Sequence, residues 1–217
     1  MLTQEDTQIM RSGIYRTIPK VEPLESRQKL LDASQNLPFY LMDLSLSKRS
    51  GVRGKQAEQY LSKKIKDITE NPDQDNTLPE RPNEVSALTN NRLVFRLSNT
   101  EYWLLQPFDA ADLSVETGAS FPDQCYPLFC QYSHAWFILA GSARAELMAK
   151  LCSVDLSAKA FPTNSIAQTS VAKTNATIAS HSLGEASVFS ILCDSSVAEY
   201  LWEAINEAVK EFLKPAE

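Results

Sequence analysis

The sequence has few residues that could build a nucleotide site. It contains only six glycines among 217 residues, and none of them forms the G-x-G-x-x-G turn that lets backbone amides approach a dinucleotide pyrophosphate. The segment most similar to a phosphate loop, Gly51 to Lys55, lacks the full G-x-x-x-x-G-K-[ST] frame and is more typical of a turn before a helix. We therefore expect no nucleotide to bind this chain.

Residues for metal binding or nucleophilic catalysis are also scarce. The four cysteines have no paired C-x-x-C spacing and are expected to be reduced packing residues: Cys125, Cys130, Cys152 and Cys193. Of the two histidines, His134 opens an apolar strand pattern, which favours a hydrogen-bonded structural role over a ligand or catalytic role. His181 lies in a polar stretch and is expected to be solvated. No G-x-S-x-G elbow is present, so we predict no catalytic, cofactor-binding or metal-binding residue.

Positive charge is in deficit, with 21 lysines and arginines against 27 acidic residues and a formal net charge of -6. This balance argues against a nucleic-acid partner, which needs a concentrated cationic face. No apolar run approaches the roughly 20 residues of a membrane-spanning helix, and the first residues lack the pattern of a signal peptide. We therefore expect a cytoplasmic protein without a membrane partner.

The sequence does contain alternating strand and helix patterns. Residues 1–36 mix charges and prolines around a short helical pattern at 25–32, and we interpret them as an N-terminal arm. A first α+β lobe is predicted over 37–108 and a second over 125–217. The acidic, Gly- and Pro-containing segment 109–124 is predicted to link them.

Each lobe has its own predicted elements. In the first, apolar spacing predicts a helix at 57–68, and two β-rich runs flanking 98–100 predict a hairpin. In the second, we predict a strand at 133–140, a helix after Gly141, strands at 166–171, 176–179 and 188–193, and a closing amphipathic helix. Aligning Gly54 with Gly141 also places Leu61 on Met148. This pattern suggests two related lobes, but alone it leaves duplication open.

Tryptophans occupy strand and helix positions with apolar neighbours: Trp103, Trp136 and Trp202. They could line a ligand pocket, but these positions favour a core or interface role.

A family resemblance begins in the second lobe. The segment from Tyr132 to Leu156, followed by Ala160-Phe-Pro and Ala167-Gln-Thr-Ser, resembles the gamma subunit of heterotetrameric sarcosine oxidases. Asp43-Leu-Ser, the segment from Gly51 to Gly54, and Leu78-Pro-Glu-Arg-Pro-Asn83 extend the resemblance to about residues 37–213.

The resemblance implies an α+β fold of two pseudo-repeated lobes, related to the folate-binding domain of aminomethyltransferases. It also implies a non-catalytic subunit of a complex in one-carbon metabolism that oxidatively demethylates sarcosine or a related N-methyl amino acid. In such a complex the alpha, beta and delta subunits hold FAD, FMN, NAD, tetrahydrofolate and zinc. None of these cofactor sites maps onto this chain.

The alternative is a free-standing, folate-binding aminomethyltransferase-like protein. Those enzymes carry a carboxylate segment before a strand, whereas the corresponding positions here are Asn90 and Asn91, whose amides cannot act as a base. The chain is also too short for their extra C-terminal barrel. The third hypothesis is an unrelated α+β binding module.

Overall fold

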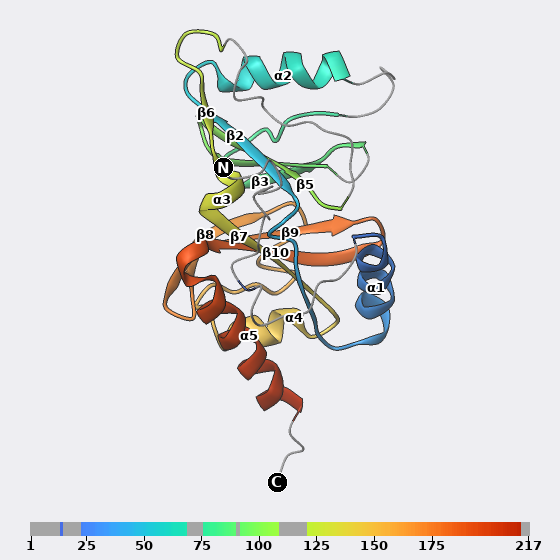
Figure 1. The fold of residues 1–217 in the computed structure, drawn as a ribbon. Coiled ribbons are helices and arrows are strands. Elements are labelled where there is room, and N and C mark those ends of the chain that lie inside the picture. Colours follow the sequence, from blue (N-terminus) through green and yellow to red (C-terminus); the bar gives the residue numbers. More distant parts are fainter. Residues whose placement is uncertain (1–13, 15–22, 69–75, 90–91, 109–120, 214–217) are drawn as a thin grey trace, which may run out of the picture.

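The computed structural model describes residue 14 and residues 23–68, 76–89, 92–108 and 121–213. Figure 1 shows helices packed on both outer faces of two sheets. The helices are α1 (Pro23–Asn36), α2 (Ala57–Ile68), α3 (Cys130–Ser133), α4 (Arg144–Ala149) and α5 (Ala198–Leu213). The strands are β1 (Tyr40–Asp43), β2 (Lys48–Arg53), β3 (Glu84–Ala87), β4 (Leu93–Ser98), β5 (Glu101–Gln106), β6 (Tyr126–Leu128), β7 (His134–Ala140), β8 (Ile166–Val171), β9 (Thr174–Leu183) and β10 (Ala186–Asp194).

The strands form two five-stranded antiparallel sheets. We call the sheet with order β3-β4-β5-β2-β6 the N-terminal sheet, and the sheet with order β1-β7-β10-β9-β8 the C-terminal sheet. Each sheet takes one edge strand from the other half of the chain, because β6 pairs with β2 and β1 pairs with β7. The two halves are therefore interlocked.

The apolar core consists of three clusters, which separate four layers of helices and sheets. Successive side chains of a strand point to opposite faces of its sheet, and β7 shows the consequence. Phe137 and Leu139 pack with α4 and α5, whereas Trp136 and Ile138 pack with the N-terminal sheet. A third cluster joins α2 to the outer face of the N-terminal sheet. The order is α2, N-terminal sheet, C-terminal sheet, then α4 with α5 (Figure 1).

The two long outer helices form because each has one apolar stripe to bury. In α2, Ala57, Leu61 and Ile65 recur every four residues and are buried, while α5 buries Leu201 and Ile205 in the same way. Burying a leucine or isoleucine side chain contributes about 1.5–3 kcal/mol. These helices are therefore held mainly by tertiary packing.

The structure confirms most of the predicted elements. The class is α+β, with two antiparallel sheets, and the expected hairpin is β4 and β5, with Val94 opposite Leu104. The helical pattern in the arm belongs to α1, which extends to Asn36. The lobe boundaries stay a prediction, since residues 109–120 of the linker lie outside the described residues. Within the described part, no helix is both long and apolar enough to cross a membrane.

Candidate functional site

A hydrogen-bonded cluster of three side chains lies between the two sheets: His181, Ser190 and Trp136. The indole Nε1–H of Trp136 donates to Ser190 Oγ at 2.9 Å, and Ser190 Oγ lies 2.6 Å from His181 Nε2. His181 Nδ1 lies 3.2 Å from the carbonyl oxygen of Ser182. All these contacts are satisfied if neutral His181 carries its proton on Nδ1 and Ser190 donates to Nε2. In this cluster every polar side-chain atom then has a partner, and His181 is the Nδ1–H tautomer.

The expectation that His181 is solvated was wrong. Its side chain is fully buried, because β9 continues to Leu183 and alternation turns His181 inward together with Ala179 and Leu183. The polar neighbours Ser180 and Ser182 point to the opposite face of the strand. The ring of Phe95 from the other sheet meets the imidazole edge-on, with 6.2 Å between centroids.

Acid is expected to destabilise the fold through His181. Burial lowers the pKa of His181 to about 4, below the value near 6.5 of an unfolded histidine. The unfolded state therefore binds the proton first, and stability falls as pH drops from about 6.5 to 4, by up to about 3 kcal/mol. Urea unfolding across this window should show a steeper loss for the wild type than for His181→Gln. Equal slopes would contradict this, since every carboxylate is common to both proteins.

The second histidine, His134, lies half-buried where the two sheets meet. Ser133 Oγ is 2.8 Å from its Nδ1, and the ring of Trp103 packs edge-on with 4.7 Å between centroids. Burial lowers the pKa of His134, while the charge of Asp194 opposes this shift. The predicted hydrogen bond of His134 is present, and its structural role stays a prediction.

A buried arginine links the same region across both sheets. Arg49, on β2, is only 4% exposed. Its guanidinium donates to five carbonyl oxygens, those of Leu44, Ser45, Ser47, Gln131 and His134, at 2.8–3.3 Å. Burial lowers the pKa of Arg49 to about 10, and the charge of Asp43 opposes this. Arg49 thus ties the β1–β2 connection, α3 and β7 together.

A second arginine performs a similar task on the outer face of the N-terminal sheet. Arg96 Nη2 pairs with Glu58 of α2 at 3.1 Å, and Nη1 donates to the carbonyl oxygens of Pro79 and Glu80. The hydroxyl of Tyr102 donates to the same Glu58 carboxylate at 2.9 Å. These contacts hold α2 and the segment before β3 against the sheet.

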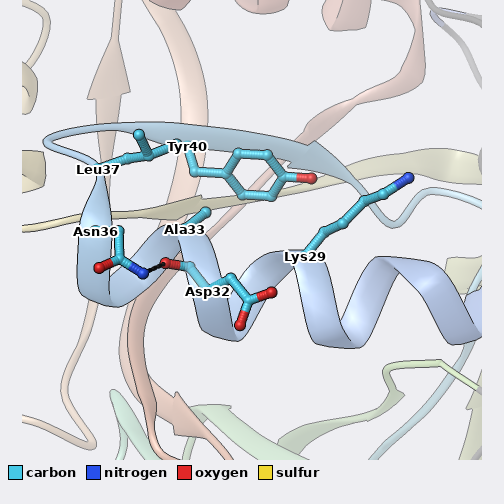
Figure 2. Close-up of a pocket in the computed structure, with 6 residues that line it drawn as sticks. All are labelled: Lys29, Asp32, Ala33, Asn36, Leu37 and Tyr40. Atoms are coloured by element: carbon cyan, nitrogen blue, oxygen red, sulfur yellow. Dashed lines mark hydrogen bonds between the residues drawn. The ribbon is translucent and has the colours of Figure 1, made fainter.

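A surface hollow of about 320 Å³ lies between α1 and the start of β1. Figure 2 shows its six lining residues: Lys29, Asp32, Ala33, Asn36, Leu37 and Tyr40. Asn36 Nδ2 donates to the main-chain oxygen of Asp32, and burial raises the pKa of Tyr40. The hollow follows the seam where the helix of the arm packs on the C-terminal sheet.

The glycine turn and the cysteines considered in the sequence analysis are packed against other parts of the chain. Gly54, at φ 132°, faces the carbonyl of Gln124, so a backbone oxygen fills the space next to this turn. All four cysteines are free and buried, as predicted, and burial raises the pKa of the Cys130 thiol to about 12. In the described part of the chain, no three His, Cys, Asp or Glu residues gather as a metal site. Asn90 and Asn91 lie outside the described residues.

The three tryptophans lie in the core, as their sequence contexts favoured. Trp136 is fully buried, and Trp103 and Trp202 are 7% and 8% exposed. Sequence reasoning missed Arg49 and Arg96 because their carbonyl partners are brought near only by the folded chain. The one available signal was Arg96, a charged residue inside the apolar run of β4.

Comparison with known proteins supplies the family. The sequence matches the GCVT N-terminal domain over residues 38–216. A chain of the heterotetrameric sarcosine oxidase from Corynebacterium sp. U-96, solved in complex with pyrrole 2-carboxylate, has a similar fold. The TM-score is 0.69 at 20% identity, and the match covers 97% of this chain and 100% of that one.

A second solved structure is similar over part of its length. The glycine cleavage system aminomethyltransferase T from Bartonella henselae matches with a TM-score of 0.56 at 18% identity, covering 87% of this chain and 50% of that chain. The present chain thus corresponds to about half of that enzyme. No curated protein matches the sequence. The family match spans most of the chain, and both structures share its fold: the chain belongs to the GCVT N-terminal domain family.

Proposed function

We propose that this chain is a non-catalytic, gamma-type subunit that supports the assembly of a sarcosine-oxidase-like complex. The observation that carries the proposal is end-to-end correspondence with one chain of a heterotetrameric sarcosine oxidase, covering 97% of one chain and 100% of the other. Aminomethyltransferase T is matched over only half its length. The extent of the two matches therefore supports a relation to the oxidase chain more than a relation to the whole transferase.

The polar chemistry of the described residues supports a structural role. Both terminal nitrogens of Arg49 donate to main-chain carbonyls, and burial favours the neutral form of His181 inside the core. Perturbed groups at an active site usually face a cleft where substrate can reach them. Here the shifted groups Arg49 and His181 are buried between the sheets, and burial is the main cause of both pKa shifts.

The proposal includes a duplication that relates the two halves. The strands β1 to β5 correspond in order to β6 to β10. With this correspondence the two sheets have the same strand order, and β1 and β6 each lie in the sheet of the other half. Asn83 and Asn164 both precede a strand, both have positive φ (65° and 71°), and contact reciprocally. The carbonyl of Asn83 accepts from Ile166 N at 2.8 Å, and that of Asn164 from Val85 N at 2.9 Å.

The cofactors of the proposed complex lie in its other subunits. FAD, FMN, NAD, tetrahydrofolate and zinc are assigned to alpha-, beta- and delta-type partners, and this chain binds none of them. The assembly works in the cytoplasm on sarcosine or a related N-methyl amino acid.

Purification of the tagged full chain from its native host tests the subunit role. We expect larger flavin-bearing chains to co-purify in a fixed ratio, seen by mass spectrometry and by visible absorption. The chain expressed alone should be colourless and bind neither flavin nor tetrahydrofolate. Flavin absorbance that stays with the isolated chain would contradict the proposal. A lone 24.2 kDa species that titrates with tetrahydrofolate would establish the free-standing folate-binding alternative.

A further inference from the structure

The described surface has a concentration of exposed aromatic rings on β6, on α3 and on the residue between them. Tyr126, Phe129 and Tyr132 are 61%, 68% and 72% exposed, and all fall within seven residues. We call these three residues the aromatic triplet. Single exposed apolar residues are normal on a protein, but large side chains gathered in one place mark an interaction site.

The backbone that carries the triplet is anchored. Arg49 Nη2 donates to the carbonyl of Gln131 at 2.8 Å, and the Arg49 backbone N–H donates to the Gln131 side chain at 2.7 Å. Ser195 Oγ donates to the carbonyl of Tyr132 at 2.9 Å, while Cys130 between the rings is buried. The rings are therefore displayed from a preorganised support, which reduces the entropy cost of binding.

The position of the triplet suits a contact with another chain. β6 is an edge strand of the N-terminal sheet, and Figure 1 places α3 where the two sheets come together. A tyrosine or phenylalanine side chain buries about 150–250 Å², so the exposed parts of three rings offer roughly 400 Å². A stable interface needs about 800 Å² on each partner. The triplet can supply the aromatic centre of such an interface, with polar neighbours as its rim.

We propose that the aromatic triplet docks this chain onto a non-identical protein chain of its complex. This inference rests on the proposed function. The partner would offer an apolar surface that receives three rings, with hydrogen-bond acceptors at its edge for the two phenolic hydroxyls. A second copy is disfavoured because each carries a formal net charge of -6, and like charges repel. Full-length correspondence to a chain of a heterotetramer also favours a different partner.

A photo-crosslinking amino acid at position 129 tests the contact directly. With the tagged full chain in its native host, we expect crosslinks from position 129 to a flavin-bearing chain. The same probe at Leu37, which is 45% exposed at the end of α1, should give none. Crosslinks to a second copy of the chain, or to no protein while flavin-bearing chains still co-purify, would overturn the docking proposal.

Substitution gives an independent readout. Phe129→Ser with Tyr132→Ser should reduce capture of the flavin-bearing chains at least tenfold, the loss expected for hot-spot rings, whereas Leu37→Ser should leave it unchanged. Unaltered thermal unfolding would show that the double variant is folded. Equal capture by the wild type and the double variant would refute docking through the aromatic triplet, but it would not contradict the proposed subunit role. A wild-type chain that captures no such partner would refute both.

Discussion

Replacing Gly141 or Gly54 by alanine is expected to prevent stable folding. Both glycines have positive φ values, 108° and 132°, which L side chains rarely adopt. A Cβ at Gly141 would overlap the backbone carbonyl of Pro38, and one at Gly54 would overlap that of Gln124. Backbone atoms cannot rotate away as a side chain can, so strain adds to the clash. We expect a loss above about 4 kcal/mol for each variant, a large share of a typical domain's stability.

Gly184 provides the matched control for this effect. It also has a positive φ, 63°, but lies exposed in the turn between β9 and β10. Gly184→Asn should cost at most about 1 kcal/mol, because asparagine tolerates this region. Urea unfolding and soluble yield would measure all three variants. A Gly141→Ala or Gly54→Ala protein as stable as Gly184→Asn would contradict the close approach.

These two glycines also explain how the halves interlock. Gly141 ends β7 where the chain entering β1 crosses it, and Gly54 ends β2 where the chain entering β6 crosses it. In each case the crossing segment belongs to the other half. Aligning the two halves of the sequence placed Gly54 on Gly141. The alignment could not reveal that each glycine lies where an edge strand from the other half passes close to the backbone. Such pairing between distant segments leaves no local periodicity to read.

Local sequence patterns did predict the elements that bury apolar side chains. The stripe of Leu61 and Ile65 marks α2, since burial of one helix face imposes its period on the sequence. A continuous apolar run around Trp136 marks β7, which is buried on both faces. His181 was misjudged for the complementary reason. Its neighbours Ser180 and Ser182 are polar, yet a hydroxyl on the facing strand, that of Ser190, satisfies the imidazole inside the core.

The candidate functional surface was only partly accessible to sequence reasoning. Phe129 stands between Leu128 and Cys130, an apolar context that normally indicates burial, whereas the neighbours of Tyr132 are polar. Their exposure follows from the shortness of α3, whose single turn buries Cys130 and leaves the flanking rings outward. The sarcosine-oxidase resemblance, by contrast, was available from the order of sequence motifs, and the matching fold agrees with it.

Arg49→Met is expected to destabilise the protein by about 3–5 kcal/mol. Methionine keeps much of the aliphatic volume, so the loss isolates the hydrogen bonds to the five carbonyl oxygens. A buried acceptor left without a donor costs about 1–3 kcal/mol, although neighbouring carbonyls that move or gain water recover part of this. Those carbonyls belong to the β1–β2 connection, α3 and β7. The variant should therefore loosen the joint between the sheets.

Two further variants separate charge from geometry at this joint. Arg49→Lys keeps the charge but offers three donors from one nitrogen, so it should recover less than half of the loss. Arg53→Ala, on the same strand, removes an ion pair with Glu101 whose arginine side chain is 60% exposed, and should cost under about 1 kcal/mol. Urea unfolding of the four proteins would rank them as wild type, Arg53→Ala, Arg49→Lys and Arg49→Met. If Arg49→Met were as stable as Arg53→Ala, the carbonyls would be satisfied without Arg49, and Arg49 would not be needed to hold the two sheets together.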